Sequence, residues 1–132
     1  MPREIHLNGV VHEDERTPVV IGEDEAQRKY LLRPMTRDLR KKLNAVEKKV
    51  EDLDAERATT DLDVDDYYDR MVGIFAEGID VLLEIDNTGE QKHRTNASKV
   101  LLALYQENKL GWSQIANNYA QLRDATEEVR PI

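Results

Sequence analysis

The chain has 132 residues, no cysteine and a formal net charge of −8. That length is typical of one domain, and the lack of cysteine excludes a disulfide framework, a thiolate zinc site and a cysteine nucleophile. The acidic balance disfavours a nucleic-acid ligand, because phosphate is repelled at long range. We expect a soluble cytoplasmic protein, because the sequence shows neither a signal peptide nor an apolar run of membrane-spanning length.

Residues 1–34 are predicted to form a small N-terminal β-hairpin or meander. Asn8-Gly9 lies between apolar residues and is a dipeptide typical of tight hairpin turns. Residues 18–21 (PVVI) and 30–32 (YLL) are further short runs of β-branched, aromatic or aliphatic side chains. Their proline and charged neighbours indicate an edge structure, and a piece of two strands must lean on other elements for stability.

Residues 35–132 are predicted to form a helical domain of about four helices, so the fold is mainly α and the chain is one compact unit. The first helix begins after Thr36, a good N-cap residue. Its apolar residues step by three and four along a heptad seam about two repeats long. Two repeats are too few for a free-standing coiled coil, so packing within its own domain is favoured over a homo-oligomeric seam. The seam consists of Leu39, Leu43, Val46, Val50 and Leu53.

Residues 64–85 form the predicted central helix, which combines the strongest apolar and the strongest charge signal. Asp63 can cap it, and residues 58–92 carry ten acids against two cations, which accounts for the whole charge imbalance of the chain. Helical spacing places the apolar residues in one wide stripe around Phe75, the only phenylalanine. The stripe consists of Tyr68, Met71, Val72, Phe75, Ile79, Leu82 and Leu83.

Two shorter helices are predicted beyond a linker in which Gly89 is a candidate helix stop. Residues 97–105 (ASKVLLALY) form the first of them, and the second starts at Ser113 or its neighbour. Helical spacing predicts the buried side of the last helix. That side consists of Trp112, Ile115, Ala116, Tyr119 and Leu122.

The sequence predicts no enzyme, no metal site and no cofactor. An EF-hand loop counted from Asp61 needs glycine sixth and glutamate twelfth, where the chain has Asp66 and Val72. Helix capping and the helix dipole explain the acids at the start of the central helix. The histidines are scattered, and neither serine has the strand–turn–helix context of a hydrolase nucleophile. A solvated face, which could equally dock a basic partner, is expected from Asp66, Asp69, Glu77, Asp80 and Glu84.

The segment GWSQIANNYAQL, with its flanking helices, is reminiscent of a helix-turn-helix. Gln114, Asn117, Asn118 and Gln121 could read base edges in a DNA groove. Few cations that could contact phosphate surround them, so nucleic-acid binding is an alternative and not the leading hypothesis.

The order of elements and several phrases resemble the tail assembly chaperones of long-tailed (siphovirus-type) bacteriophages. Residues 32–43 (LRPMTRDLRKKL) are similar to the family's L-P-L-T-x-x-x-L phrase. Residues 97–132 are similar to its C-terminal block, in which a helix and a turn precede a Leu-Thr-x-x-Gln-Leu helix and a closing x-R-P-[IT]. Here residues 110–115 (LGWSQI) and 130–132 (RPI) take those places. The chain departs at Gly111-Trp112, where the family more often has an acidic-aliphatic pair.

This resemblance implies a non-enzymatic role in virion morphogenesis in the host cell cytoplasm. Such chaperones bind the long, helical, aggregation-prone tape measure protein while the tail tube polymerises around it. Client binding needs apolar surface that can pack on helices. One candidate is the seam Leu39, Leu43, Val46, Val50 and Leu53, and the other is the stripe Met71, Phe75, Ile79 and Leu82. If the seam is wholly buried within its own chain, it cannot be the client-binding surface. A helix-turn-helix regulator and a structural component of the virion tail are the alternatives.

Overall fold

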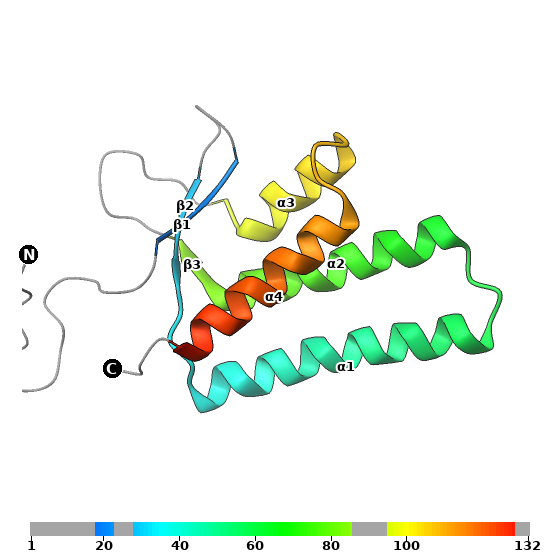
Figure 1. Ribbon diagram of the computed structural model, residues 1–132, viewed down its shortest axis with the longest axis horizontal. Helices are drawn as coiled ribbons and strands as arrows, with labels where there is room; N and C mark the ends of the chain where they lie inside the picture. Colours follow the sequence, from blue (N-terminus) through cyan, green and yellow to red (C-terminus); the bar gives the residue numbers. More distant parts are fainter. Residues whose placement is uncertain (1–17, 23–27, 86–94, 129–132) are drawn as a thin grey trace, which may run out of the picture.

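The computed structural model describes residues 18–22, 28–85 and 95–128, so the Asn8-Gly9 turn and the Gly89 stop lie outside the described residues. The structure is mainly helical, with four helices and a small antiparallel sheet, as predicted (Figure 1). In chain order the elements are β1 (Pro18–Ile21), β2 (Arg28–Leu32), α1 (Arg37–Thr59), α2 (Val64–Leu82), β3 (Leu83–Ile85), α3 (Ala97–Gln106) and α4 (Trp112–Glu128).

Helices α1 and α2 run antiparallel and form the long axis of the molecule (Figure 1). Both predicted N-caps are confirmed. The Thr36 hydroxyl accepts a hydrogen bond from the Leu39 amide at 3.1 Å, and the Asp63 carboxylate accepts one from the Asp66 amide at 3.2 Å. These caps satisfy amide groups that the first turn of a helix leaves without partners, which fixes where each helix begins.

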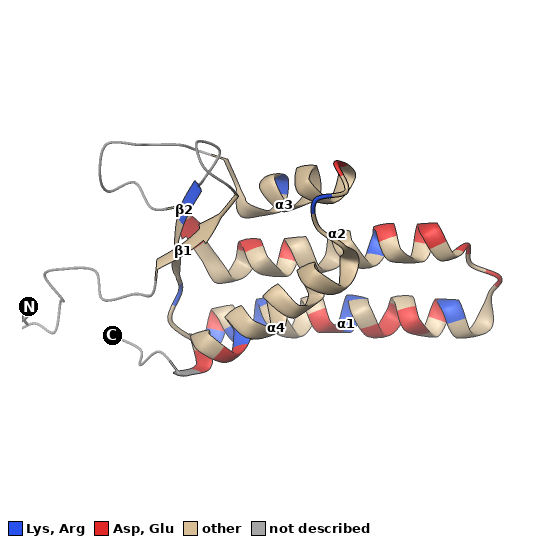
Figure 2. Ribbon diagram, turned by 45° about the horizontal axis from the view of Figure 1, so that its top comes forward, with Lys and Arg blue, Asp and Glu red and all other residues tan. Residues whose placement is uncertain are grey.

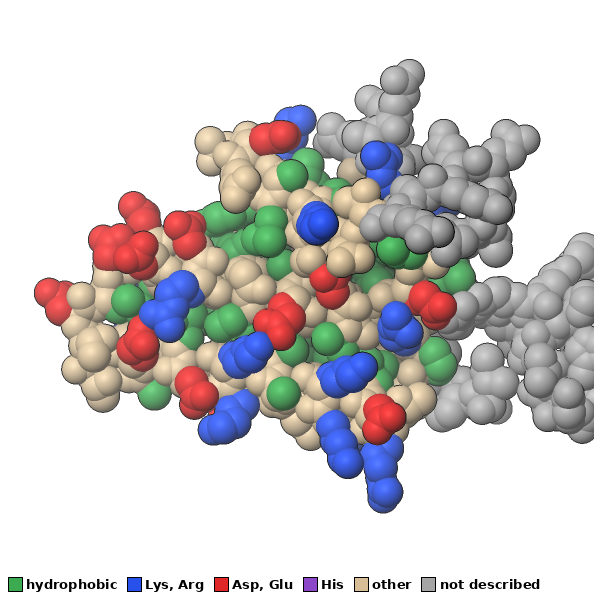
Figure 3. Space-filling view, turned by 180° about the vertical axis from the view of Figure 1, so that it is seen from behind, with side chains coloured by type: hydrophobic (Ala, Val, Ile, Leu, Met, Phe, Trp, Pro, Cys, Tyr) green, Lys and Arg blue, Asp and Glu red, His purple; other side chains and the backbone are tan. Residues whose placement is uncertain are grey.

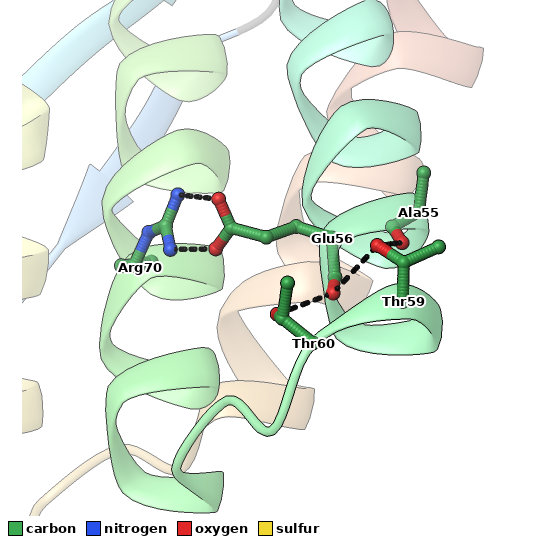
Figure 4. Close-up of polar contacts among 5 residues, drawn as sticks. All are labelled: Ala55, Glu56, Thr59, Thr60 and Arg70. Atoms are coloured by element: carbon green, nitrogen blue, oxygen red, sulfur yellow. Dashed lines mark hydrogen bonds and ion pairs between the residues drawn. The ribbon is translucent and has the colours of Figure 1, made fainter.

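Helix α1 ends at Thr59, beyond the last seam residue. The amide of Thr60 donates to the Glu56 carbonyl oxygen at 2.8 Å. The Thr60 hydroxyl donates to the same oxygen at 2.6 Å and closes the final turn (Figure 4). The Glu56 carboxylate also accepts hydrogen bonds from both terminal nitrogens of Arg70 in α2. This forked pair joins the two helices beside their connecting turn.

The sheet contains a strand that the sequence pattern does not predict. Helical spacing predicts helix through residue 85, whereas Leu83–Ile85 forms β3 and pairs with β2. The strand order is β1-β2-β3, and Leu32 lies opposite Leu83. A short apolar run fits either a strand or a helix end, so only the pairing with β2 distinguishes them. The β element therefore extends beyond residues 1–34.

One apolar core joins the sheet to all four helices. Helix α2 lies at its centre and packs against α1, α3 and α4. Leu32 of β2, Ile79 and Leu82 of α2, and Ile115 of α4 are completely shielded from solvent. A second, smaller cluster fills the space between α1 and α2 nearer their connecting turn, and consists of Leu53, Tyr67 and Met71.

The seam of α1 packs inside this chain. Leu39, Leu43, Val46 and Leu53 are each at most 6% exposed, and Val50 is partly buried against the smaller cluster. Four of the five seam side chains are therefore covered by the rest of the fold, and Val50 is covered in part. In the stripe of α2, Met71, Ile79 and Leu82 are buried and Phe75 is partly buried.

Helix α4 approaches α2 closely at Gly78. A Cβ placed on Gly78 would lie 2.5 Å from Cε1 of Tyr119 and 3.1 Å from Cγ1 of Val46. We therefore expect Gly78→Ala to lower the free energy of unfolding by about 1–3 kcal/mol through overpacking.

Gly73, one turn earlier in the same helix, is the matched control, because a Cβ there meets nothing within 4 Å. Gly73→Ala should raise the stability by up to about 1 kcal/mol through helix propensity. Urea denaturation followed by circular dichroism measures both changes. Equal shifts of the same sign would contradict the close approach of α4.

Two buried tyrosines differ in what their hydroxyls contact. The Tyr30 hydroxyl donates to the Thr95 carbonyl oxygen at 2.7 Å, whereas no hydrogen-bond partner for the Tyr119 hydroxyl lies among the described residues. Burial raises the pKa of each phenol to about 12, helped by the negative charge of Asp80 near Tyr30 and of Glu47 near Tyr119. The unfolded phenols ionise near pH 10, so the stability gained from keeping them neutral is complete below that pH and is lost as the pH rises towards 12.

We expect Tyr30→Phe to cost about 1 kcal/mol at neutral pH, because the Thr95 carbonyl loses a donor. Tyr119→Phe should be neutral or stabilising, since it removes a buried hydroxyl without a partner. Both variants should lose less stability than the parent between neutral pH and about pH 11. Urea denaturation at the two pH values tests this, and an unchanged alkaline loss in both variants would contradict it.

Candidate functional site

An apolar groove of about 320 Å³ lies between the edge strand β1 and helices α3 and α4. Ile79 and Leu101 are almost completely buried and form its base. Leu104, Leu110 and Leu122 line its walls on the helical side. On the other side Val19, Val20 and Ile21 of β1 complete the lining, and the polar residues Lys109, Asn118 and Gln121 also border the groove.

The start of α3, which carries one wall of the groove, is fixed by a carboxylate from α2. Asp80 Oδ1 accepts a hydrogen bond from the Ser98 amide at 2.8 Å, and its other oxygen accepts one from the Ser98 hydroxyl. The N-cap residue Asn96 makes no such side-chain bond, so Asp80 takes its place. Asp80 therefore does not belong to a solvated face, as the sequence suggests, but is partly buried and ties α3 to α2.

The turn between α3 and α4 is closed by its own backbone. The amides of Lys109 and Leu110 donate to the Leu104 carbonyl oxygen at 2.8 and 3.3 Å, while Asn108 adopts a φ of 60°. Asparagine tolerates this left-handed conformation better than most residues, which suits it to the end of a helix. The turn places Leu104 and Leu110 together on the groove.

Strand β1 gives the groove an open edge. It pairs with β2 on one side, and no other described strand pairs with its outer side. Val20 is 51% exposed beside that edge. An unpaired strand edge is a template for main-chain hydrogen bonds, and an apolar groove next to it can hold side chains of the added segment.

The acids of α2 also contact neighbouring elements. Asp69 accepts a hydrogen bond from the Tyr105 hydroxyl at 2.8 Å, and Glu77 pairs with Lys49 at 2.8 Å. The hydrogen bond to Asp69 raises the pKa of Tyr105. Asp69 and Glu77 remain exposed as expected, while linking α2 to α3 and to α1. No group of three or more histidine, cysteine or acidic side chains suited to a metal ion occurs within the described ranges.

The residues of the helix-turn-helix alternative serve other contacts. Gln114 Oε1 accepts a hydrogen bond from the Gly111 amide at 2.7 Å, and Asn118 and Gln121 line the groove, whereas Asn117 is exposed. Arg123 is the single lysine or arginine in the sequence of α4, and it pairs with Glu47 at 2.8 Å. This helix therefore offers no cation of its own that is free to contact phosphate.

Trp112, which helical spacing predicts on the buried side of the last helix, is 39% exposed. It is the first residue of α4, and its ring stacks on Tyr68 of α2 at 4.8 Å between centroids, with 18° between the planes. The predictions for Ile115 and Tyr119 are confirmed, since both are buried, while Ala116 and Leu122 are partly buried. Thr126 is also fully buried, which the pattern does not indicate.

The sequence pattern does not predict the groove. Leu122 is on the predicted buried side of the last helix, but nothing in the sequence indicates that it meets Val19 and Leu110. None of the described helices is long and apolar enough to cross a membrane. Comparisons with known protein families, with characterised proteins and with solved structures found no match to this chain.

The cap that Asp80 supplies can be tested by Asp80→Ala. We expect a loss of about 1–2 kcal/mol in stability and faster hydrogen exchange at the Ser98 amide, because the first turn of α3 loses its acceptor. Glu77→Ala removes another acid of α2 and breaks an exposed ion pair with α1. It should lower the stability by less and leave hydrogen exchange at the Ser98 amide unchanged. If both variants exchanged equally at Ser98, the cross-helix cap would be contradicted.

Proposed function

We propose that this chain is a non-enzymatic binding protein that acts as a phage tail assembly chaperone and holds the tape measure protein in the host cytoplasm. The observation that carries the proposal is the apolar groove between β1, α3 and α4. The resemblance of residues 31–132 to such chaperones supplies the identity of the client. The proposal does not include the seam of α1, because four of its five side chains are buried within this chain.

The groove has the chemistry that an apolar client requires. Its base and walls are aliphatic, and polar side chains at Lys109, Asn118 and Gln121 border it. Peptide grooves commonly take the apolar face of an amphipathic helix through anchors spaced three and four residues apart. A volume of about 320 Å³ lies at the lower end for ligand pockets, so it suits a few client side chains at a time.

The surface charge supports the same role. A complex with an aggregation-prone client exposes added apolar surface and benefits from strong net charge. The chain carries −8, and no aspartate or glutamate is among the described residues that line the groove.

Leu104→Asn tests the groove. Leu104 lines the groove and is only partly buried, so the variant should fold. Removing one apolar anchor should weaken client binding about tenfold or more, given roughly 1.5–3 kcal/mol for a buried leucine. The measurement is the soluble fraction of tape measure protein co-expressed with each variant.

Ala103→Asn is the matched control, because Ala103 is the exposed neighbour on the same helix. The soluble fraction of the client should be the same with this variant as with the parent chain. If the parent chain itself failed to raise client solubility, the chaperone proposal would fall. Detection of the chain in purified virions would instead favour a structural component of the tail.

A further inference from the structure

A second surface lies at the end of the molecule where α1 turns into α2. Trp112 and Tyr68 stack there, and the edge of the Tyr67 ring packs on Tyr68 at 5.4 Å between centroids. Trp112 is more than a third exposed, and Val64 at the start of α2 is 51% exposed. Exposed aromatic side chains of this kind are enriched where proteins bind partners.

An open pocket of about 480 Å³ adjoins the exposed Trp112 ring. Asp69 and Tyr105 form one side of it, and residues of the α3–α4 turn together with Trp112 form the other. The pocket is held in shape by the hydrogen bond between Tyr105 and Asp69 and by the amide of Gly111 bound to Gln114. It shares only Leu110 with the groove described above.

The pocket borders the most acidic stretch of the chain through Asp69. The five aspartates among residues 58–69 are all exposed, and that stretch contains no lysine or arginine. Figure 3 shows acidic side chains gathered at this end of the molecule, and basic side chains gathered along the opposite end of α1. Figure 2 shows the same acids on the turn and on the first turns of α2. The five are Asp61, Asp63, Asp65, Asp66 and Asp69.

Carboxylates and ring faces favour the same kind of ligand. The face of an aromatic ring carries partial negative charge and attracts lysine and arginine, and carboxylates form charge-assisted hydrogen bonds with them. No ion pair between described residues involves Asp61, Asp65 or Asp69, so their charge is available to a partner. A phosphate-bearing ligand would be repelled, and the described acids do not converge into a metal site.

We propose that this pocket takes a lysine or arginine side chain from a basic segment of a partner protein, held between the exposed face of Trp112 and the carboxylates of Asp65 and Asp69. Asp69 lines the pocket, and Asp65 lies one helical turn before it on the same side of α2. Tyr105 orients Asp69 through their hydrogen bond. The proposal does not depend on the chaperone role, because the groove and this pocket are different surfaces.

Trp112 is the only tryptophan of the chain, so its fluorescence reports directly on the pocket. The probe is the blocked peptide acetyl-Ala-Arg-Ala-Arg-Ala-amide, and the control probe carries neutral citrulline in place of arginine. We expect the arginine peptide to change the Trp112 emission and the citrulline peptide to leave it unchanged. The response should weaken between about 20 mM and about 300 mM salt, as the screening length shortens.

The double variant Asp65→Asn/Asp69→Asn should raise the dissociation constant about fivefold or more, because both carboxylates lose their charge. Asparagine can still accept the Tyr105 hydrogen bond, so the pocket should keep its shape. Asp124→Asn, an exposed acid three turns along α4 from Trp112, is the matched control and should change binding less than twofold.

Amide chemical shifts give a second reading, and the largest changes with the arginine peptide should fall at Gly111 and Trp112. Three results would overturn the proposal. The first is an equal response to both peptides, and the second is an equal loss in the control variant. The third is self-association in sedimentation experiments with Trp112 shielded, because a second copy would then be the occupant.

Discussion

The burial of α2 on three sides is the constraint on which the other elements depend. It packs against α1, α3 and α4, and the chain passes without a break from its last residue, Leu82, into β3. Because Gly78 has no side chain, Tyr119 lies directly against the backbone of α2. The same helix thus sets the position of the sheet, of α3 and of α4.

This arrangement explains why the acids of α2 are not simply a solvated face. A helix surrounded by others has few positions that face only water. Asp80 caps α3, Asp69 accepts a hydrogen bond from the Tyr105 hydroxyl, and Glu77 forms an ion pair with Lys49 of α1. Asp61 and Asp65, before and within the first turn of α2, are exposed and form no ion pair between described residues. The acids at the start of α2 therefore add surface charge, whereas Asp69, Glu77 and Asp80 link the helix to its neighbours.

The two surfaces proposed for binding arise from the same geometry. The groove forms over α2 between α3 and α4, and the edge strand β1 lines its remaining side. The acidic pocket forms at the other side of the α3–α4 turn, where Trp112 leaves the core and stacks on Tyr68. One surface is aliphatic and the other is aromatic and charged. They therefore suit different chemistries in a partner, and each can be altered without the other.

Features that depend on residues close together in the chain follow from the sequence alone. Local spacing predicts the helix caps at Thr36 and Asp63 and the apolar faces of the helices. It also predicts the strands at residues 18–21 and 30–32. Two further features depend on contacts across the fold: residues 83–85 leave the helix to pair with β2, and Asp80 caps a helix 18 residues away. The same holds for the groove, which joins Val19 to Leu122, and for the exposure of Trp112. These contacts join residues that are distant in sequence, and such residues become neighbours only when the whole core assembles.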